Sequence, residues 1–137
     1  MHIESSLGFK LSKAAQRMFE LFRPALDEAG ITSKQNGAML IINEHPNLTQ
    51  KEVAEIQGTD RTTMGQIIDQ LEKKHLLVRV KHPSDRRAYW LELTEKGKNL
   101  IDILWATMKE REDVFLKKLD EDERKQLFIL LDKIEKE

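Results

Sequence analysis

The sequence predicts a mainly α-helical chain with one small antiparallel β-hairpin. Apolar residues recur at helical spacing over most of the 137 residues. Helix-start signals, in which a capping residue is followed three positions later by Gln or Glu, occur at Thr32, Thr49 and Asp120. Only between Leu76 and Leu93 does the pattern change to that of strands. The length favours one compact subunit.

The first predicted helix covers residues 5–29 and carries one apolar stripe along a single face. Gly30 suits the position just past its end, where a left-handed backbone is common. Pro24 lies inside the pattern, so we expect it to kink this helix or to split off its last turn.

Three short helices are predicted to follow. Thr32 opens the first, which stops before Pro46 because the residue preceding a proline avoids the helical region. Thr49 opens the second and Gly58 closes it. Asp60 suits the cap of the third, which continues to about residue 74 with its apolar residues facing inward.

The hairpin and two further helices complete the chain. Residues 76–80 and 88–93 are rich in β-branched, aromatic and aliphatic residues and flank a polar turn, which is typical of two antiparallel strands. Thr94 then caps a long helix that we expect to reach about Leu119. The last helix follows Asp120 and has apolar residues at helical spacing.

The positive charge of the chain is concentrated in one segment. The whole sequence has 23 basic and 24 acidic residues, and this net charge of −1 taken alone argues against a nucleic-acid partner. Between residues 73 and 87, however, six basic residues accompany one acid. Many charge runs are only solvated faces, so the surrounding elements decide between the two readings.

The order helix–helix–helix–hairpin describes a winged helix-turn-helix, flanked here by long helices. The outer face of the third short helix is polar, which suits insertion into the DNA major groove, where Arg pairs with guanine and Gln with adenine. The start of the preceding helix, with Thr49, Gln50 and Lys51, suits a phosphate. The basic hairpin tip could lie in an adjacent minor groove.

Several motifs resemble those of the MarR family of bacterial transcription regulators. The most specific are Asp85-Arg-Arg-Ala88 in the hairpin and Leu93-Thr-Glu-Lys-Gly97 after it, and the stretch Leu48-Thr-Gln-Lys-Glu-Val-Ala-Glu-Ile-Gln-Gly58 agrees with them. The resemblance covers nearly the whole chain. It implies a homodimer that binds a pseudo-palindromic operator, more often as a repressor than as an activator.

The residue pattern and this resemblance together define the candidate DNA contacts. The resemblance implies that Arg87 enters the minor groove and that Asp85 orients an arginine or stabilises the turn. The full set is Thr49, Gln50, Lys51, Arg61, Thr62, Thr63, Gly65, Gln66, Lys73, Lys81, His82, Asp85, Arg86 and Arg87.

The resemblance also implies three segments with separate tasks. Residues 1–30 and 95–137 would form the dimerisation helices, and residues 31–94 the DNA-binding lobe. This agrees with the apolar stripes of these helices, because a lone subunit has few other elements that could cover them. The candidate dimerisation residues are Leu7, Leu11, Met18, Phe22, Leu104, Met108, Phe115, Leu127, Leu131 and Ile134.

Two positions depart from the family pattern. His75 stands where the family commonly has Gly at the end of the recognition helix, and a left-handed backbone there would cost His more than Gly. Gly65 stands where the family often has a polar or small hydroxyl residue. A glycine within a helix costs about 1 kcal/mol relative to Ala, so Gly65 either permits a close approach of DNA or marks an altered base preference.

The resemblance implies that a small, often aromatic, effector binds between the dimerisation helices and the DNA-binding lobe. Phe19, Trp90, Trp105 and Met108 either line such a pocket or belong to the core and the dimer interface. The absence of cysteine excludes the thiol-oxidation switch that some members of the family use. No other cofactor is expected.

Other classes of protein find little support. The four histidines show no i, i+3 or i, i+4 pair, and no nucleophile elbow, phosphate-binding glycine loop or paired-carboxylate signature occurs, so we expect neither a metal site nor an enzyme. The longest apolar runs have five residues and indicate a cytoplasmic protein without a membrane span. We therefore predict a DNA-binding transcription regulator with double-stranded operator DNA as its partner. The alternative is a winged-helix adaptor that binds proteins instead of DNA, which the overall acidity favours.

Overall fold

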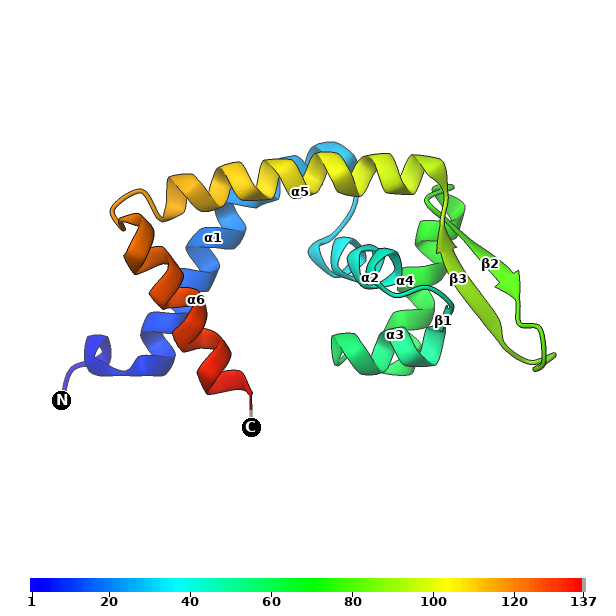
Figure 1. The fold of residues 1–137 in the computed structure, drawn as a ribbon, viewed down its shortest axis with the longest axis horizontal. Helices are drawn as coiled ribbons and strands as arrows, with labels where there is room; N and C mark the ends of the chain where they lie inside the picture. The colour runs from blue at the N-terminus through cyan, green and yellow to red at the C-terminus, as the bar shows by residue number, and fades with distance from the viewer. Residues whose placement is uncertain (137) are drawn as a thin grey trace. The chain divides into compact units, whose positions relative to one another are not determined.

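The computed structural model describes residues 1–136 and confirms a mainly α-helical chain with a small antiparallel sheet (Figure 1). In chain order, the elements of this part are the 3-10 helix η1 (Ile3–Ser5), α1 (Leu7–Ala29), α2 (Ser33–Glu44), β1 (Leu48–Thr49), α3 (Gln50–Gln57), α4 (Arg61–Lys73), β2 (Leu77–Lys81), β3 (Tyr89–Leu93), α5 (Glu95–Phe115) and α6 (Glu121–Glu135).

The chain divides into two compact units. The first unit combines residues 1–22 with 107–137, and the second unit comprises residues 23–106. The sequence places its segment boundaries at residues 30 and 94, where helices end or begin. The two units divide α1 and α5 within their lengths, because each of these long helices supplies one portion to each unit.

The predicted helix starts are confirmed as reciprocal hydrogen bonds. The Thr32 hydroxyl accepts from the Gln35 amide at 3.1 Å, and the Gln35 side chain accepts from the Thr32 amide at 3.1 Å. Asp120 with Glu123 and Thr49 with Glu52 repeat this arrangement. Each box satisfies backbone donors that a helix start leaves without partners.

Pro24 does not split off the last turn of the first helix, so this one of the two predicted outcomes is wrong, and a kink stays a prediction. The helix α1 is continuous from Leu7 to Ala29 with Pro24 inside it. A proline removes only one backbone hydrogen bond. Phe22 and Leu26, on either side of it, are both buried, so packing holds the last turns in place.

The sheet contains a third strand that was not predicted. Its order is β1-β3-β2, and all pairs are antiparallel. In β1, Leu48 pairs with Leu91 and Thr49 with Trp90. A two-residue strand is too short to show an alternating pattern, so only its partner reveals it. The strand β1 leads directly into α3 and thereby ties the start of α3 to the hairpin.

The core of residues 23–106 lies between the three short helices, the sheet and the start of α5. The inner face predicted for α4 is confirmed, because all four of its apolar residues are buried. The largest fully buried side chains are Met39, Val53, Met64, Ile68, Leu71, Leu77, Leu91 and Ile101.

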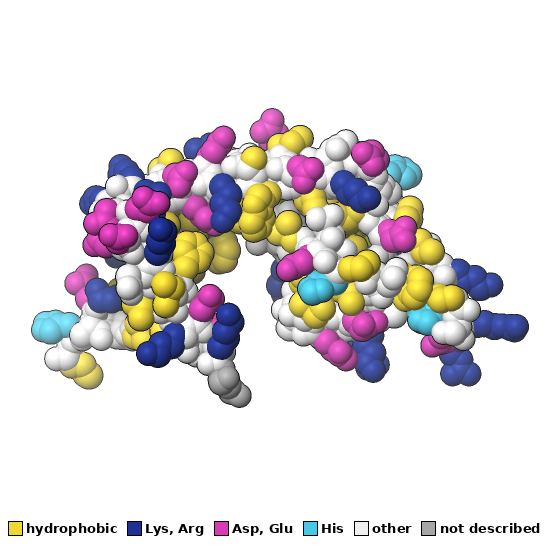
Figure 2. Space-filling model, in the orientation of Figure 1, with side chains coloured by type: hydrophobic (Ala, Val, Ile, Leu, Met, Phe, Trp, Pro, Cys, Tyr) yellow, Lys and Arg dark blue, Asp and Glu magenta, His cyan; other side chains and the backbone are white. Residues whose placement is uncertain are grey.

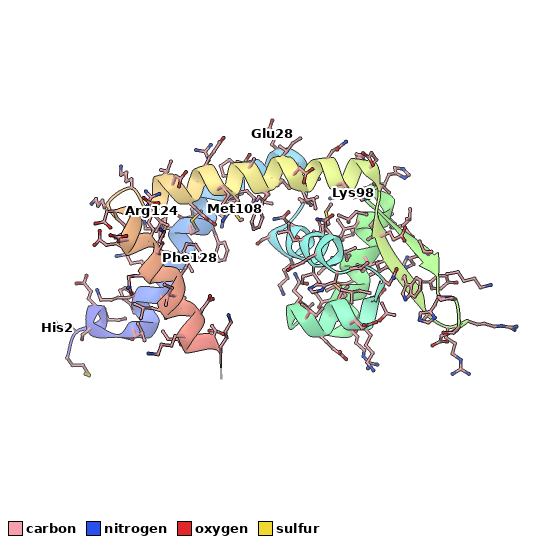
Figure 3. The ribbon with its side chains drawn as sticks, viewed as in Figure 1. His2, Glu28, Lys98, Met108, Arg124 and Phe128 are labelled. Atoms are coloured by element: carbon pink, nitrogen blue, oxygen red, sulfur yellow. The ribbon has the colours of Figure 1, made fainter. Side chains whose placement is uncertain are left out.

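The helix α5 ends at Phe115, one turn before the predicted end at Leu119. The Arg124 guanidinium donates hydrogen bonds to the carbonyls of Leu116 and Leu119, at 3.0 and 3.2 Å, and pairs with the Asp113 carboxylate at 3.0 Å (Figure 3). Because this side chain from α6 satisfies the carbonyls of the connection, the chain turns early. Among residues 1–136, no helix is long and apolar enough to cross a membrane.

Candidate nucleic-acid interface

The helix α4 presents a polar outer face at its first two turns. Asp60 caps the helix by accepting a hydrogen bond from the Thr63 amide at 2.8 Å. The residues Arg61, Thr62 and Gln66 are exposed, as predicted from their spacing. Their side chains are therefore free to meet the edges of base pairs.

The hydroxyl of Thr63 is already used within the chain. It donates to the second carboxylate oxygen of Asp60 at 2.7 Å. These two hydrogen bonds from Thr63 lower the pKa of Asp60 below its ordinary value. The structure therefore gives Thr63, a candidate DNA contact, a capping role.

A cationic cleft lies between the starts of α3 and α4 and the hairpin. Its cavity has a volume of about 460 Å³, and four cations and one acid are among its lining residues. The charged residues of this cationic cleft are Lys51, Arg61, Arg79, Arg87 and Asp85. The cleft also includes Thr49 and Gln50, so it brings together candidates from three separate segments. Its net positive charge suits a phosphate backbone.

Arg79 on β2 joins the sheet to α4. Its guanidinium pairs with the Asp69 carboxylate at 2.7 Å and with the Glu72 carboxylate at 2.6 Å. The hydrogen bond to Asp69 raises the pKa of Arg79 above its ordinary value. Sequence reasoning counted Arg79 in the basic run but missed this role. Two acids one turn apart on α4, followed by a lone arginine in the next strand, were the available signal.

The hairpin tip is shaped by two residues that were predicted to touch DNA. The Nδ1 atom of His82 accepts from the Ser84 amide at 3.1 Å and from the Asp85 amide at 3.0 Å. The Asp85 carboxylate accepts from the Arg87 amide at 2.9 Å. Asp85 therefore stabilises the turn, one of the two roles that the resemblance implied, and His82 supports the loop from inside.

Three other residues of the hairpin tip are exposed cations. Lys81, Arg86 and Arg87 form no ion pair with any other residue in the described chain. Figure 2 shows Lys and Arg side chains projecting around the end of the hairpin. These three side chains are available to an anionic partner.

The structure divides the basic run of residues 73–87 among three places. Arg79 is paired with acids, and the cations of the hairpin tip project outward. Lys73 and Lys74, in contrast, line a second cavity, with a volume of about 890 Å³, at the other end of α4. That Lys73 joins the DNA contacts stays a prediction.

The end of α4 is held against the start of α5. His75 has a φ of 59°, so it adopts the left-handed backbone that its position required. The Thr94 hydroxyl donates to the His75 carbonyl at 2.6 Å, and the Thr94 amide donates to the Leu76 carbonyl at 3.0 Å. Gly97 packs so closely that a Cβ there would lie 2.1 Å from the Leu76 oxygen. This explains in physical terms why the motif after the hairpin ends in glycine.

The four candidate effector residues are divided between the two units. Phe19 and Met108 belong to the first unit, whereas Trp90 and Trp105 belong to the second. The Trp90 ring lies 5.0 Å from the His82 ring inside the hairpin, and its place in an effector pocket stays a prediction. None of the four lines the cavity of about 890 Å³, whose apolar lining includes Leu76, Leu100 and Ile103.

The candidate dimerisation residues differ widely in exposure. Phe22 and Leu104 are buried within the subunit and offer almost no surface to a partner. Met18, Met108, Phe115 and Leu127 are half-buried, and Leu7, Leu11, Leu131 and Ile134 are exposed. Phe128, Ile129 and Leu130, which were not among the predicted dimerisation residues, are also exposed on α6 (Figure 3). Throughout its length α6 has no buried residue.

A metal centre finds no support in the part of the chain that the structure describes, which has no group of three or more His, Asp or Glu residues able to hold an ion.

Comparisons with known proteins identify transcription regulators as relatives of this chain. The family model described as "MarR family" matches residues 31–89. A transcriptional regulatory protein of Thauera aromatica named for the hcr operon is 34% identical, over 93% of this chain and 78% of its own length.

Two solved structures extend this similarity to the whole fold. The transcriptional repressor CouR, bound to a 23-mer DNA duplex, has a TM-score of 0.89 and 31% identity, and the match covers 98% of this chain and 95% of CouR. The regulator PcaV of Streptomyces coelicolor, in complex with its natural ligand, has a TM-score of 0.83 and 27% identity over 98% of this chain and 94% of PcaV.

Proposed function

The chain belongs to the MarR family of transcription regulators rather than to an enzyme family, and we propose that it acts as a repressor. In this proposal it binds a pseudo-palindromic operator as a homodimer, and a small-molecule effector releases it from the DNA. Residues 31–94 carry the DNA contacts in this proposal, and residues 1–30 and 95–137 carry the dimer contacts. Because the proposed partner is chromosomal DNA, we expect the protein to act in the cytoplasm.

The cationic cleft carries the DNA part of the proposal. It lies beside the exposed residues at the start of α4, and the hairpin supplies Arg87 to it. This arrangement lets α4 enter the major groove while the hairpin follows the backbone into the minor groove. A similar fold with 31% identity binds DNA in CouR, which supports the same use here.

The exposed apolar residues support a homodimer. Leu7 and Ile134 are 64% and 68% exposed, and α6 has a run of exposed apolar residues from Phe128 to Leu131 (Figure 2). Apolar surface of this extent on helices at both ends of a chain marks an interface. A two-fold dimer would present two copies of α4 about 10 bp apart along DNA.

The DNA proposal is tested by mobility shift with the DNA that flanks the gene, at about 50 mM and about 200 mM salt. We expect a specific shift that weakens steeply as salt rises. Absence of a salt-sensitive shift would refute DNA binding and favour the adaptor reading. In vitro transcription from the same DNA then tests repression, which an increase in transcript would contradict.

The role of Arg87 is tested by Arg87→Ala. Because this side chain is exposed and unpaired within the described chain, its loss should weaken binding to all sequences and reduce the salt slope by about 1. Lys118→Ala, on the exposed connection between α5 and α6, is the matched control and should leave both quantities unchanged. Equal slopes for Arg87→Ala and the parent would exclude the proposed contact.

The dimer is tested by sedimentation at micromolar protein concentration. We expect a mass of two chains for the parent protein and a shift toward one chain for Leu131→Glu, which adds a charge to the exposed apolar surface of α6. A parent protein of single-chain mass would refute the dimer.

The effector part is supported by the ligand-bound structure of PcaV and by the cavity at the end of α4, where apolar residues accompany Lys73, Lys74 and Lys96. Apolar walls with cations suit an aromatic acid. Benzoate and hydroxybenzoates should raise the melting temperature and weaken the DNA complex. If none of them does either, this class of effector is excluded.

A further inference from the structure

Gln50 lies against Gly65 on the outer side of α4. The two residues come from different helices, since Gln50 is the first residue of α3 and Gly65 lies in the second turn of α4. The Nε2 atom of Gln50 is 3.4 Å from the position that a Cβ on Gly65 would occupy. A side chain from α3 thus covers the place where α4 has none.

The carboxamide of Gln50 is free to bind a ligand. Of the five glutamines in residues 23–106, three form side-chain hydrogen bonds within the chain. These are Gln35, Gln57 and Gln70. Gln50 and Gln66 form none with any residue of the described chain, and Gln66 is exposed next to Gly65. Both carboxamides are therefore unpaired, and that of Gln50 lies beside Gly65 from another helix.

The glycine at position 65 is not required by close packing. A Cβ there would meet only the Gln50 amide, at an ordinary van der Waals distance. Gly65 is half-buried and follows the exposed pair Arg61 and Thr62 by one turn. What the glycine provides is a place on α4 without a side chain, against which the Gln50 amide lies.

We infer that Gln50 reads a base pair in the major groove across Gly65, in place of the side chain that the recognition helix lacks. Glutamine presents a donor and an acceptor in the spacing of adenine N6 and N7. This inference rests on the proposed DNA-binding function and goes beyond it, because the start of α3 was expected only to hold a phosphate.

Lys51, the next residue, separates the two kinds of contact. Lys51 is exposed, charged and part of the cationic cleft, so it suits a phosphate. A phosphate contact affects all DNA sequences equally and contributes to the salt slope. A base contact affects one position of the site and leaves the salt slope unchanged.

The experiment combines selection from random DNA with salt titration for the parent protein, Gln50→Ala and Lys51→Ala. For Gln50→Ala we expect the preference at one base pair of each half-site to fall by about 5- to 150-fold, with an unchanged salt slope. Lys51→Ala, the matched control, should keep the parent consensus and lower the salt slope by about 1.

The role of Gly65 is tested by Gly65→Val, whose branched side chain has no hydrogen-bonding group and would displace the Gln50 amide. It should reduce the preference at the same base pair as Gln50→Ala, and the double variant should lose little more than either single variant. Melting temperatures of all variants show whether each one is folded before binding is compared.

Three results would overturn the inference. Gln50→Ala with the parent consensus, the parent salt slope and a lower affinity for all sequences would make Gln50 a phosphate contact, because a neutral carboxamide releases no counterion. Gln50→Ala with the parent consensus and the parent affinity would remove it from the interface. Gly65→Val acting at a different base pair would break the link between the two residues. A parent protein that selects no site would instead refute the proposed function, and the inference with it.

Discussion

Two glycines on helices of residues 23–106 should respond in opposite ways to the same substitution. At Gly97 a Cβ would lie 2.1 Å from the Leu76 carbonyl oxygen and 3.1 Å from its carbon, both backbone atoms that cannot rotate away. At Gly65 the nearest atom, at 3.4 Å, is the end of the flexible Gln50 side chain. Gly97→Ala and Gly65→Ala are therefore each other's control.

The magnitude for Gly97→Ala follows from the contacts around it. Relief of the clash needs a shift of roughly 1 Å between α5 and the chain after α4, and overpacking of this kind costs about 1–3 kcal/mol. The shift also strains the two hydrogen bonds of Thr94, to His75 and Leu76, each of which contributes about 1 kcal/mol. Against a helix-propensity gain of at most about 1 kcal/mol, we expect a net loss of about 2–4 kcal/mol.

Gly65→Ala keeps the propensity gain without a clash, so its stability should rise by up to about 1 kcal/mol. Urea unfolding followed by far-ultraviolet circular dichroism, at one fixed protein concentration, measures both variants. The reasoning is refuted if Gly97→Ala is as stable as the parent protein, or if both substitutions destabilise it equally.

Three further variants probe the remaining contacts around α4. Arg79→Met should lower the free energy of unfolding by about 1 kcal/mol, because it removes two partly exposed ion pairs. Replacing both acidic partners, Asp69 and Glu72, by their amides should restore most of this loss in urea unfolding. Arg79→Met with the stability of the parent protein would contradict this expectation. His75→Gly should raise the free energy of unfolding by about 0.5–1 kcal/mol, since glycine accepts a φ of 59° without strain, and a decrease would indicate an unrecognised imidazole contact. The hydrogen bonds from Thr63 lower the pKa of Asp60, so the stabilisation is present above its ordinary pKa of 3.8 and is lost as the pH falls through the lower folded value. In Asp60→Asn the free energy of unfolding should fall less steeply at acidic pH than in the parent protein. An identical pH dependence in the two proteins would contradict this role of Asp60.

Much of the fold was predictable from the sequence because the signals are local. The capping boxes at Thr32, Thr49 and Asp120 each depend on atoms only three residues apart. The inner and outer faces of α4 depend on a single helical period. The left-handed backbone of His75 follows from its place at a helix end.

The predictions that failed depend on contacts between distant segments. The early end of α5 results from Arg124 on the next helix, and the burial of Phe22 and Leu104 results from packing that a single stripe does not reveal. His82 stays a predicted DNA contact, and the structure adds that its ring nitrogen accepts from the loop and that its ring lies 5.0 Å from the Trp90 ring across the hairpin.

The sequence by itself determined the class of fold, the family, and the surface on which α4 offers polar side chains, since each follows from periodicity and short motifs. Only the tertiary structure decided how those side chains are used. In it, Arg79 pairs with acids of α4, and the basic residues 73–87 lie in three separate places. Gln50 lies against Gly65, and Gly97 packs against Leu76. These are distances between atoms far apart along the chain, and no pattern within a few residues encodes them.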